Sequence, residues 1–180
     1  MPGWKPVIRM AASRSNFNQL DCAGFVRLCG PFFEHSPWVA ERTWSRRPFG
    51  NLQALHDALC DTVRHASQDE QIRLIASHPD LVGRLAREGK VTRESSNEQA
   101  AAGLNVLSDS EIQQFERYNA AYREKFGFPF VICARENKKE AILKAFPARL
   151  ANSRQQEIET ALAEIFKIAR HRLLDAVSET

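Results

Sequence analysis

Small and apolar residues recur at helical spacing along most of this chain. The first stripe, with members three or four positions apart, consists of Phe17, Leu20, Gly24, Phe25, Leu28 and Cys29. This spacing places them on one face of an amphipathic helix. An aromatic-rich turn at 32–39 then leads into a short helix, which residues 47–50 break. Two later stripes predict further helices, the second of them running from about Ser153 to Ala176: Leu52, Leu55, Leu59 and Val63, then Ile158, Leu162, Ile165, Ala169 and Leu173.

The helical piece from Asp69 to Ser77 is expected to stop for a steric reason. A residue that precedes proline is pushed out of the helical conformation by the proline ring. His78 precedes Pro79. The sequence therefore predicts His78 at a helix C-terminus, in an extended conformation.

Two further helices are predicted from signals at their starts. A polar connector at 84–94 ends where a new helix is expected to begin, near Ser95 or Ser96. Ser108 and Glu111 have the spacing of a capping box, which typically starts a helix. The helix that starts there has four residues on one side: Ile112, Phe115, Tyr118 and Tyr122.

One apolar stretch does not follow the helical period. Residues 126–133 are rich in β-branched and aromatic side chains and are interrupted by Pro129. We therefore expect an all-α, single-domain helical bundle with one irregular, buried, extended segment near residues 128–134. Within the 180 residues, 1–16 are expected to form an N-terminal extension and 17–177 the domain.

Composition excludes several classes of protein. Hydrophobic residues make up 43% and charged residues 26%, as in an ordinary globular domain, and the net charge is +3. That charge is too small to argue for a nucleic-acid partner. The chain has neither an apolar run of membrane-spanning length nor a secretory signal, so we expect a cytoplasmic protein without a membrane partner. The four cysteines form no Cys-x-x-Cys pair, and a disulfide framework is not expected.

The candidate chemistry gathers around His78 and residues 94–104. A histidine can serve as a general acid or base near neutral pH, but at a helix end it can also simply bond to free carbonyl groups. Glu98 and Gln99 have similar alternatives. Ser95 with Glu98, and Ser96 with Gln99, both match the capping box, which is a purely structural device.

The sequence offers no sign of a metal ion or cofactor. The remaining histidines, His35, His56, His65 and His171, are scattered and make no recognised metal-ligand spacing. A phosphate-binding loop and a nucleophile elbow are also missing. We therefore expect no metal and no cofactor.

Taken together, these residues resemble the 2-oxo-4-hydroxy-4-carboxy-5-ureidoimidazoline (OHCU) decarboxylase family. The resemblance runs from about Phe17 to Leu173. It is carried by the joint order and spacing of short segments at 36–40, 47–49, 77–81, 94–100, 103–104, 119–122, 125–132, 149–152 and 172–173. The first of them reads Ser-Pro-Trp-Val-Ala, and the third reads Ser-His-Pro-Asp-Leu.

The resemblance implies an all-helical enzyme that needs no cofactor and is often a homodimer. The implied reaction converts OHCU to S-allantoin in urate breakdown. His78 and Glu98 would be catalytic. The implied substrate-binding residues are Pro79, Ser95, Ser96, Asn97, Glu98, Gln99, Phe130, Val131, Ile132, Cys133, Ala134 and Arg172.

In the chemistry that this implies, His78 is the acid-base group. Glu98 would hold the ureido N–H groups and raise the basicity of His78, and Arg172 would help to neutralise the anionic substrate. Gln99 and the backbone near Ile132 would bind the ring carbonyl groups.

Three alternatives remain at this stage. The first is a non-catalytic helical interaction module, including one that binds nucleic acid, although acidic residues are interspersed along the helices. The second is a piece of a bifunctional polypeptide, because the chain is too short to hold both domains of such a protein. The third is a family member that keeps the fold without the activity.

Overall fold

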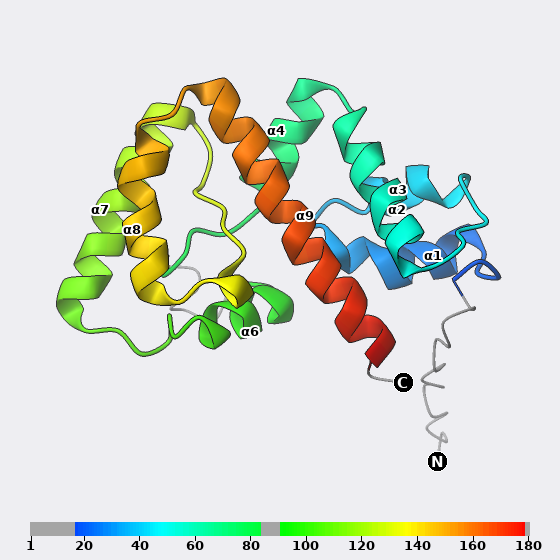
Figure 1. Ribbon diagram of the computed structural model, residues 1–180, viewed down its shortest axis with the longest axis horizontal. Coiled ribbons are helices and arrows are strands. Elements are labelled where there is room, and N and C mark those ends of the chain that lie inside the picture. The colour runs from blue at the N-terminus through cyan, green and yellow to red at the C-terminus, as the bar shows by residue number, and fades with distance from the viewer. Residues whose placement is uncertain (1–16, 84–90, 179–180) are drawn as a thin grey trace, which may run out of the picture.

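The computed structural model describes residues 17–83 and 91–178, and these residues form helices without any strand (Figure 1). The α-helices are α1 (Cys22–Cys29), α2 (Trp38–Trp44), α3 (Leu52–Arg64), α4 (Gln68–Ala76), α6 (Arg93–Ala101), α7 (Asp109–Phe126), α8 (Lys139–Leu150) and α9 (Arg154–Ser178). Two 3-10 helices are η1 (Gly30–Phe32) and η2 (Ala134–Glu136). The all-α prediction is confirmed. The predicted extension at 1–16 and residues 84–90 of the connector lie outside the described residues.

Side-chain caps set most of the helix starts. The Asp21 carboxylate accepts a hydrogen bond from the Gly24 N–H at 2.7 Å and starts α1. The predicted capping box is confirmed at α7, where Ser108 and Glu111 each bond to the backbone of the other. These caps satisfy N–H groups that have no partner inside the helix.

The predicted start of α6 is wrong by two or three residues. The N-cap is Thr92, whose hydroxyl oxygen accepts the Ser95 N–H at 3.3 Å. Ser95 therefore lies inside the first turn and cannot cap the helix. Because Ser95 and Ser96 are not N-caps, the capping-box interpretation of Glu98 and Gln99 does not hold.

Helix α8 was not expected from the sequence pattern. Its charged residues are spread around the helix, and Pro147 interrupts it near its C-terminal end. Two aromatic neighbours hold it against α7: the Phe146 ring packs on Phe115 and stacks on Tyr118. Tertiary packing, rather than a periodic apolar stripe, accounts for this helix.

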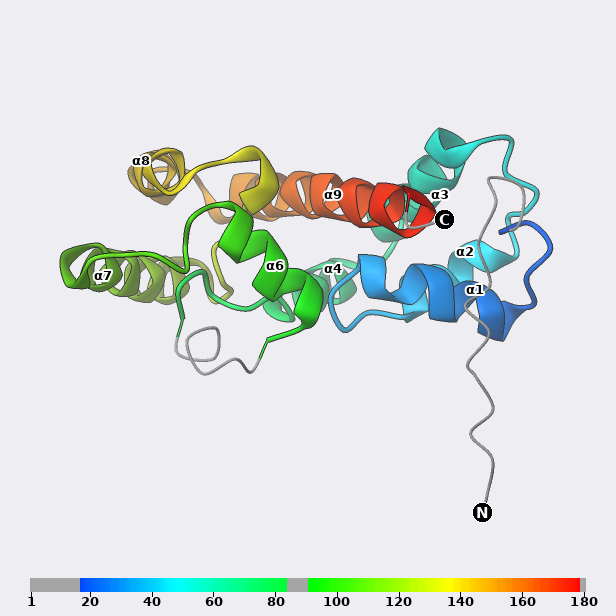
Figure 2. The same cartoon turned by 90° about the horizontal axis from the view of Figure 1, so that it is seen from below.

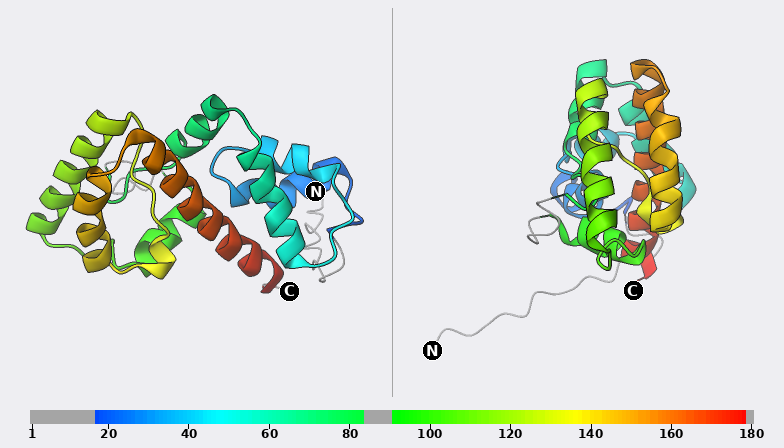
Figure 3. Two further views of the ribbon diagram at one scale, coloured as in Figure 1. Left: turned by 45° about the horizontal axis from the view of Figure 1, so that its top comes forward. Right: turned by 90° about the vertical axis from the view of Figure 1, so that its left-hand side faces the viewer.

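The helices lie in two layers, and α9 runs through the middle of the molecule (Figures 2 and 3). Seen from below, α8, α9 and α3 form one layer, and α7, α6, α4 and α1 form the other. Helix α9 contacts α7, α4, α3 and η1 in turn along its length. A residue near the C-terminal end of α9 can therefore meet segments from the N-terminal part of the chain.

The irregular buried segment is confirmed between α7 and η2. Residues 128–133 are non-helical and buried, while Ala134 already belongs to η2. Helix α7 is followed by its C-cap Gly127, whose φ of +80° suits glycine and turns the chain inward. The Phe130 ring then stacks on Phe146 with centroids 3.9 Å apart. The segment is anchored by its side chains, which leaves its backbone as the polar surface.

A buried ion pair also holds this segment. The Arg149 guanidinium donates to the Val131 carbonyl at 2.6 Å and to the Glu157 carboxylate at 2.9 Å. The Tyr122 hydroxyl donates to the same carboxylate.

Within the described residues, none of the helices is apolar over a length that could cross a membrane.

Candidate active site

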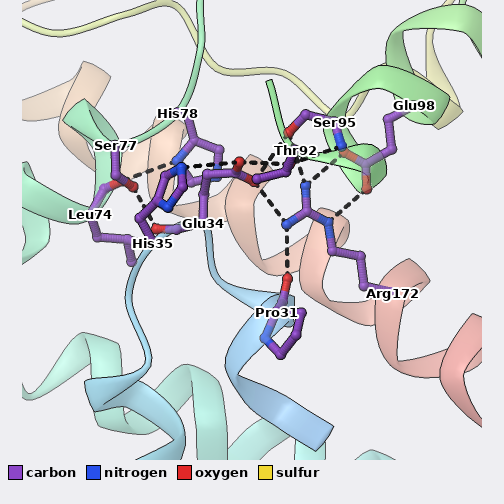
Figure 4. Close-up of polar contacts among 10 residues, drawn as sticks. All are labelled: Pro31, Glu34, His35, Leu74, Ser77, His78, Thr92, Ser95, Glu98 and Arg172. Atoms are coloured by element: carbon purple, nitrogen blue, oxygen red, sulfur yellow. Dashed lines mark hydrogen bonds and ion pairs between the residues drawn. The ribbon is translucent and has the colours of Figure 1, made fainter. Parts of the chain in front are cut away.

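His78 lies where the sequence places it, just beyond the C-terminal end of α4. Helix α4 ends at Ala76, and the His78 N–H bonds to the Ile75 carbonyl at 3.2 Å. The imidazole Nδ1 is 3.0 Å from the Leu74 carbonyl oxygen (Figure 4). Because a carbonyl only accepts hydrogen bonds, Nδ1 must carry the proton. The other ring nitrogen, Nε2, is then unprotonated.

The Nε2 atom of His78 is buried and has no hydrogen-bond partner among the described residues. The side chain as a whole is only 6% exposed. Burial lowers the pKa of His78 to about 4, against the opposing effect of the Glu34 carboxylate. The histidine is therefore neutral at physiological pH, with a free lone pair on a buried nitrogen. Unpartnered buried polar atoms are costly and are often found at functional sites.

Glu34 is a site residue that sequence analysis did not identify. It follows η1 and is only 3% exposed, and its carboxylate accepts hydrogen bonds from Thr92 at 2.8 Å and Ser95 at 3.1 Å. Burial alone would raise the pKa of Glu34, but the Arg172 charge and the Thr92 hydroxyl hold it below its usual value. Glu34 therefore places a negative charge close to His78.

Arg172 of α9 lies between two carboxylates (Figure 4). It donates to Glu98 through Nε at 2.8 Å and Nη2 at 2.9 Å, and to Glu34 through Nη1 at 3.0 Å. The remaining N–H groups point to the Pro31 carbonyl at 3.0 Å and the Ser95 hydroxyl at 3.4 Å. All five guanidinium donors thus have protein acceptors. Arg172 is set to orient Glu98 and Glu34 rather than to bind an anion directly.

Gln99 supports the loop that follows His78. Its side-chain oxygen accepts the Val82 N–H at 3.1 Å, and Asn119 donates to the Leu81 carbonyl at 2.8 Å. Val82 has a φ of +56°, which a β-branched residue rarely adopts. The two amide side chains hold this strained loop in place. The Gln99 NH₂ group has no acceptor in the described part of the chain and is available to a ligand.

The backbone of the buried segment is only partly paired. The Val131 carbonyl is taken by Arg149, and the Cys133 N–H donates to Glu164 at 2.8 Å. Within the described residues, no protein partner is found for the N–H or carbonyl of Ile132. Ile132 is buried, so these two groups are suited to a polar ligand.

A small cavity of about 30 Å³ joins these groups. Its lining includes most of the residues expected from the sequence: His78, Pro79, Ser95, Glu98, Gln99, Phe130, Val131, Ile132, Ala134 and Arg172. Three others lie elsewhere. Asn97 and Ser96 are exposed on α6 and line separate cavities of about 410 and 440 Å³, and Cys133 is buried behind the wall.

One signal in the sequence could have pointed to Glu34. It is an acidic residue directly after the apolar pair Phe32 and Phe33, in a stretch otherwise suited to the core. A carboxylate in such a place must find a partner when it is buried. The identity of that partner, 138 residues away on α9, has no signal in the local pattern.

Solved structures share this fold. A crystal structure described as (S)-allantoin synthase superposes with a TM-score of 0.71 at 27% identity, covering 92% of this chain and 54% of that longer chain. A second structure, described as OHCU decarboxylase in the presence of (S)-allantoin, superposes with a TM-score of 0.67 at 23% identity, covering 88% of this chain and 99% of the other. At 23% identity the second likeness concerns the fold alone.

Sequence relatives make the assignment. The chain is 42% identical over 158 residues to the 2-oxo-4-hydroxy-4-carboxy-5-ureidoimidazoline decarboxylase of Halalkalicoccus jeotgali, a match that covers 88% of each chain. Residues 18–174, which hold every described residue of the His78 cavity, match the profile of OHCU decarboxylase. The chain therefore belongs to the OHCU decarboxylase family.

Proposed function

We propose that this chain decarboxylates OHCU to S-allantoin in urate degradation, with His78 as the acid-base residue. Family membership supports the reaction. The observation that carries the role of His78 is its buried, unpartnered Nε2 on a ring that lines the cavity with Glu98 and Gln99. A neutral imidazole with a free lone pair is equipped to take a proton first and to return it later.

The proposed step begins at the substrate hydroxyl. His78 Nε2 accepts the hydroxyl proton while the bond from the same carbon to the carboxylate breaks and carbon dioxide leaves. The electron pair passes into the ring, where the neighbouring imine accepts it. The imidazolium then gives its proton to the adjacent ring carbon, and the ring nitrogen takes up one proton from solvent. Because the substrate itself accepts the electron pair, the step needs no added cofactor.

Glu98 is proposed to bind the ureido group. Each carboxylate oxygen has two lone pairs, so both oxygens can stay on Arg172 and still accept a ureido N–H. Arg172 fixes the direction of this carboxylate. The Glu34 carboxylate raises the pKa of His78 against the effect of burial, so we propose that Glu34 supports the basicity of His78 in the way expected of Glu98 from the sequence.

The backbone of the irregular segment at 128–133, which forms the opposite wall of the cavity, is proposed to bind the substrate ring. The N–H and carbonyl of Ile132 present one donor and one acceptor, as the edge of a strand would. The Gln99 NH₂ adds a further donor. If only one face of the intermediate meets the imidazolium, protonation gives a single enantiomer.

The cavity must widen before it can hold the substrate. Its volume of about 30 Å³ has room for water rather than for a substituted ring. The cavity of about 410 Å³ shares Glu98 and Arg172 with it, and another of about 310 Å³ shares His78 and Pro79. We propose that the substrate enters from the larger of these, past the Glu98–Arg172 pair.

The homodimer, the cytoplasmic location and the 17–177 domain boundary stay predictions.

The test supplies freshly made substrate. Urate is converted by upstream enzymes in the cuvette, the purified chain is added, and circular dichroism follows the optical activity of the allantoin formed. Rapid formation of S-allantoin, well above the rate without the chain, is the expected result. If racemic allantoin accumulates at the uncatalysed rate while the chain remains folded, the chain is a family member that has lost the activity.

A further inference from the structure

A second cluster of reactive side chains lies behind the cavity wall. Cys133, Glu136 and His171 bring a sulfur, a carboxylate oxygen and an imidazole nitrogen within 4.8 Å of one another. The His171 Nε2 atom is 2.9 Å from a Glu136 oxygen. In the part of the chain that the structure describes, this is the one group of three such side chains close enough to share an ion.

The donor set has a distinct chemical preference. Thiolate, imidazole and carboxylate are the ligands of zinc, whereas magnesium and calcium are bound almost entirely through oxygen. Three protein ligands leave the fourth tetrahedral position to water. Cys133 is buried, His171 is half-buried and Glu136 is exposed, so an ion can reach the site from solvent.

Hydrogen bonds hold the backbone that carries the sulfur. The Glu136 N–H donates to the Cys133 carbonyl at 3.1 Å, and the Asn137 side chain donates to the same carbonyl at 2.9 Å. Such contacts around a ligand residue keep it in position for a metal ion. Glu164, which accepts the Cys133 N–H at 2.8 Å, fixes the backbone on the other side.

Nearby charges also favour a divalent cation. Three carboxylates, Glu136, Glu164 and Asp175, face two cations, Lys167 and Arg135. These five groups carry a net charge of −1. A doubly charged ion together with the negative charge of one thiolate would bring the net charge to zero. Lys167 lies 2.6 Å from Glu164 but 4.0 Å from Glu136, so Glu136 can turn to an ion without breaking the closer pair.

We propose that Cys133, Glu136 and His171 form a zinc-binding site that ties the cavity wall to α9. Cys133 lies between Ile132 and Ala134, which line the His78 cavity, but neither Glu136 nor His171 lines it. The ion therefore takes no part in decarboxylation. It fixes η2, and with it the wall, to the helix that carries Arg172. On binding, the Cys133 sulfur releases its proton to solvent.

The test measures metal binding by the full chain and does not involve turnover, so it is independent of the proposed function. Protein freed of metal with a chelator is titrated with zinc by calorimetry, and separately with cobalt(II) as a spectroscopic probe. We expect one zinc per chain, a higher melting temperature with zinc, and a cobalt spectrum with the thiolate charge-transfer band of a tetrahedral site.

The variants locate the site. His171→Ala and Glu136→Gln change accessible side chains and should weaken zinc binding by at least about tenfold. Cys133→Ala should remove the thiolate band. Cys60→Ala is the matched control, because the Cys60 sulfur is also buried and lies 3.5 Å from His56 Nε2 but has no third ligand among the residues that the structure describes. Absence of stoichiometric zinc binding, or a thiolate band that Cys60→Ala removes and Cys133→Ala keeps, would overturn the proposal.

Discussion

At the residue scale, the proposal depends on one nitrogen atom of His78. Replacing His78 with Asn keeps a polar side chain of similar reach but removes the group that can exchange a proton. We expect turnover to fall by at least about 100-fold, the lower end of what a positioned acid-base residue contributes. The rate of S-allantoin formation and the far-ultraviolet circular dichroism check this together.

His65→Asn is the matched control for this substitution. His65 is exposed at the C-terminal end of α3 and does not line the His78 cavity, so it should tolerate the change with normal turnover. If the folded His78→Asn protein kept a near-normal rate, the acid-base role of His78 would be wrong.

The same histidine should make folding stability depend on pH. Burial lowers the folded-state pKa of His78 from 6.5 to about 4, so the unfolded chain binds more protons than the folded chain between these values. The free energy of unfolding is therefore not reduced by His78 above pH 6.5. As the pH falls from 6.5 toward 4, it declines by on the order of 3 kcal/mol because of this group. Urea denaturation at several pH values should show the decline, and His78→Asn should lack this part of it.

The local sequence was sufficient to place His78 but not its partners. Pro79 ends the helical conformation, so the position of His78 beyond α4 follows from steric rules acting on neighbours. The closeness of Glu34 and Arg172 does not follow in this way, because 138 residues separate them and only the packing of α9 against η1 joins them.

At the scale of elements, Glu34 connects the chain after η1 to both α6 and α9. Glu34→Gln keeps the shape but removes the charge that pairs with Arg172 and opposes the low pKa of His78. We expect the free energy of unfolding to fall by about 1–3 kcal/mol. Turnover should fall on the order of tenfold, because a His78 with an even lower pKa is a weaker base.

The pH profile separates these two effects. A purely structural role would lower stability but leave the acid limb of kcat where it is in the wild type. A positioning role near His78 should move that limb to lower pH. Glu41→Gln, an exposed acid on α2, is the control that should change neither quantity.

The success of sequence interpretation varied with the kind of signal at each element. The capping box of α7 was predicted correctly because Ser108 and Glu111 are local partners. The start of α6 was misplaced because Ser95 and Ser96 carry the same hydroxyl group as the true cap, Thr92. Helix α8 depends on aromatic packing against α7, which no short window of sequence contains.

At the scale of the whole molecule, the cavity lies where four separate parts of the chain meet. His78 follows α4, Glu98 lies on α6, Ile132 comes from the irregular segment and Arg172 belongs to α9. No helix supplies the site alone, so the periodic pattern, which predicted most of the helices, did not predict where they converge. The resemblance to a family is what pointed to residues from these separate parts, and most of the residues it implied line this cavity.

Because the cavity joins these parts, binding of the product should stabilise the entire fold. S-allantoin at about 100 times its Kd would add roughly 2.7 kcal/mol to the free energy of unfolding. For a chain of this length that corresponds to a rise of roughly 5–10 °C in Tm. If Glu98 holds the ureido group and the Ile132 backbone holds the ring, as we propose, the mirror-image arrangement of R-allantoin does not allow both contacts at once. We therefore expect a clearly smaller shift with the R enantiomer.

Thermal unfolding monitored by circular dichroism with each pure enantiomer measures the difference, and Glu98→Ala should lose most of it. Equal shifts for the two enantiomers would show that Glu98 and the wall do not form opposite sides of one binding site.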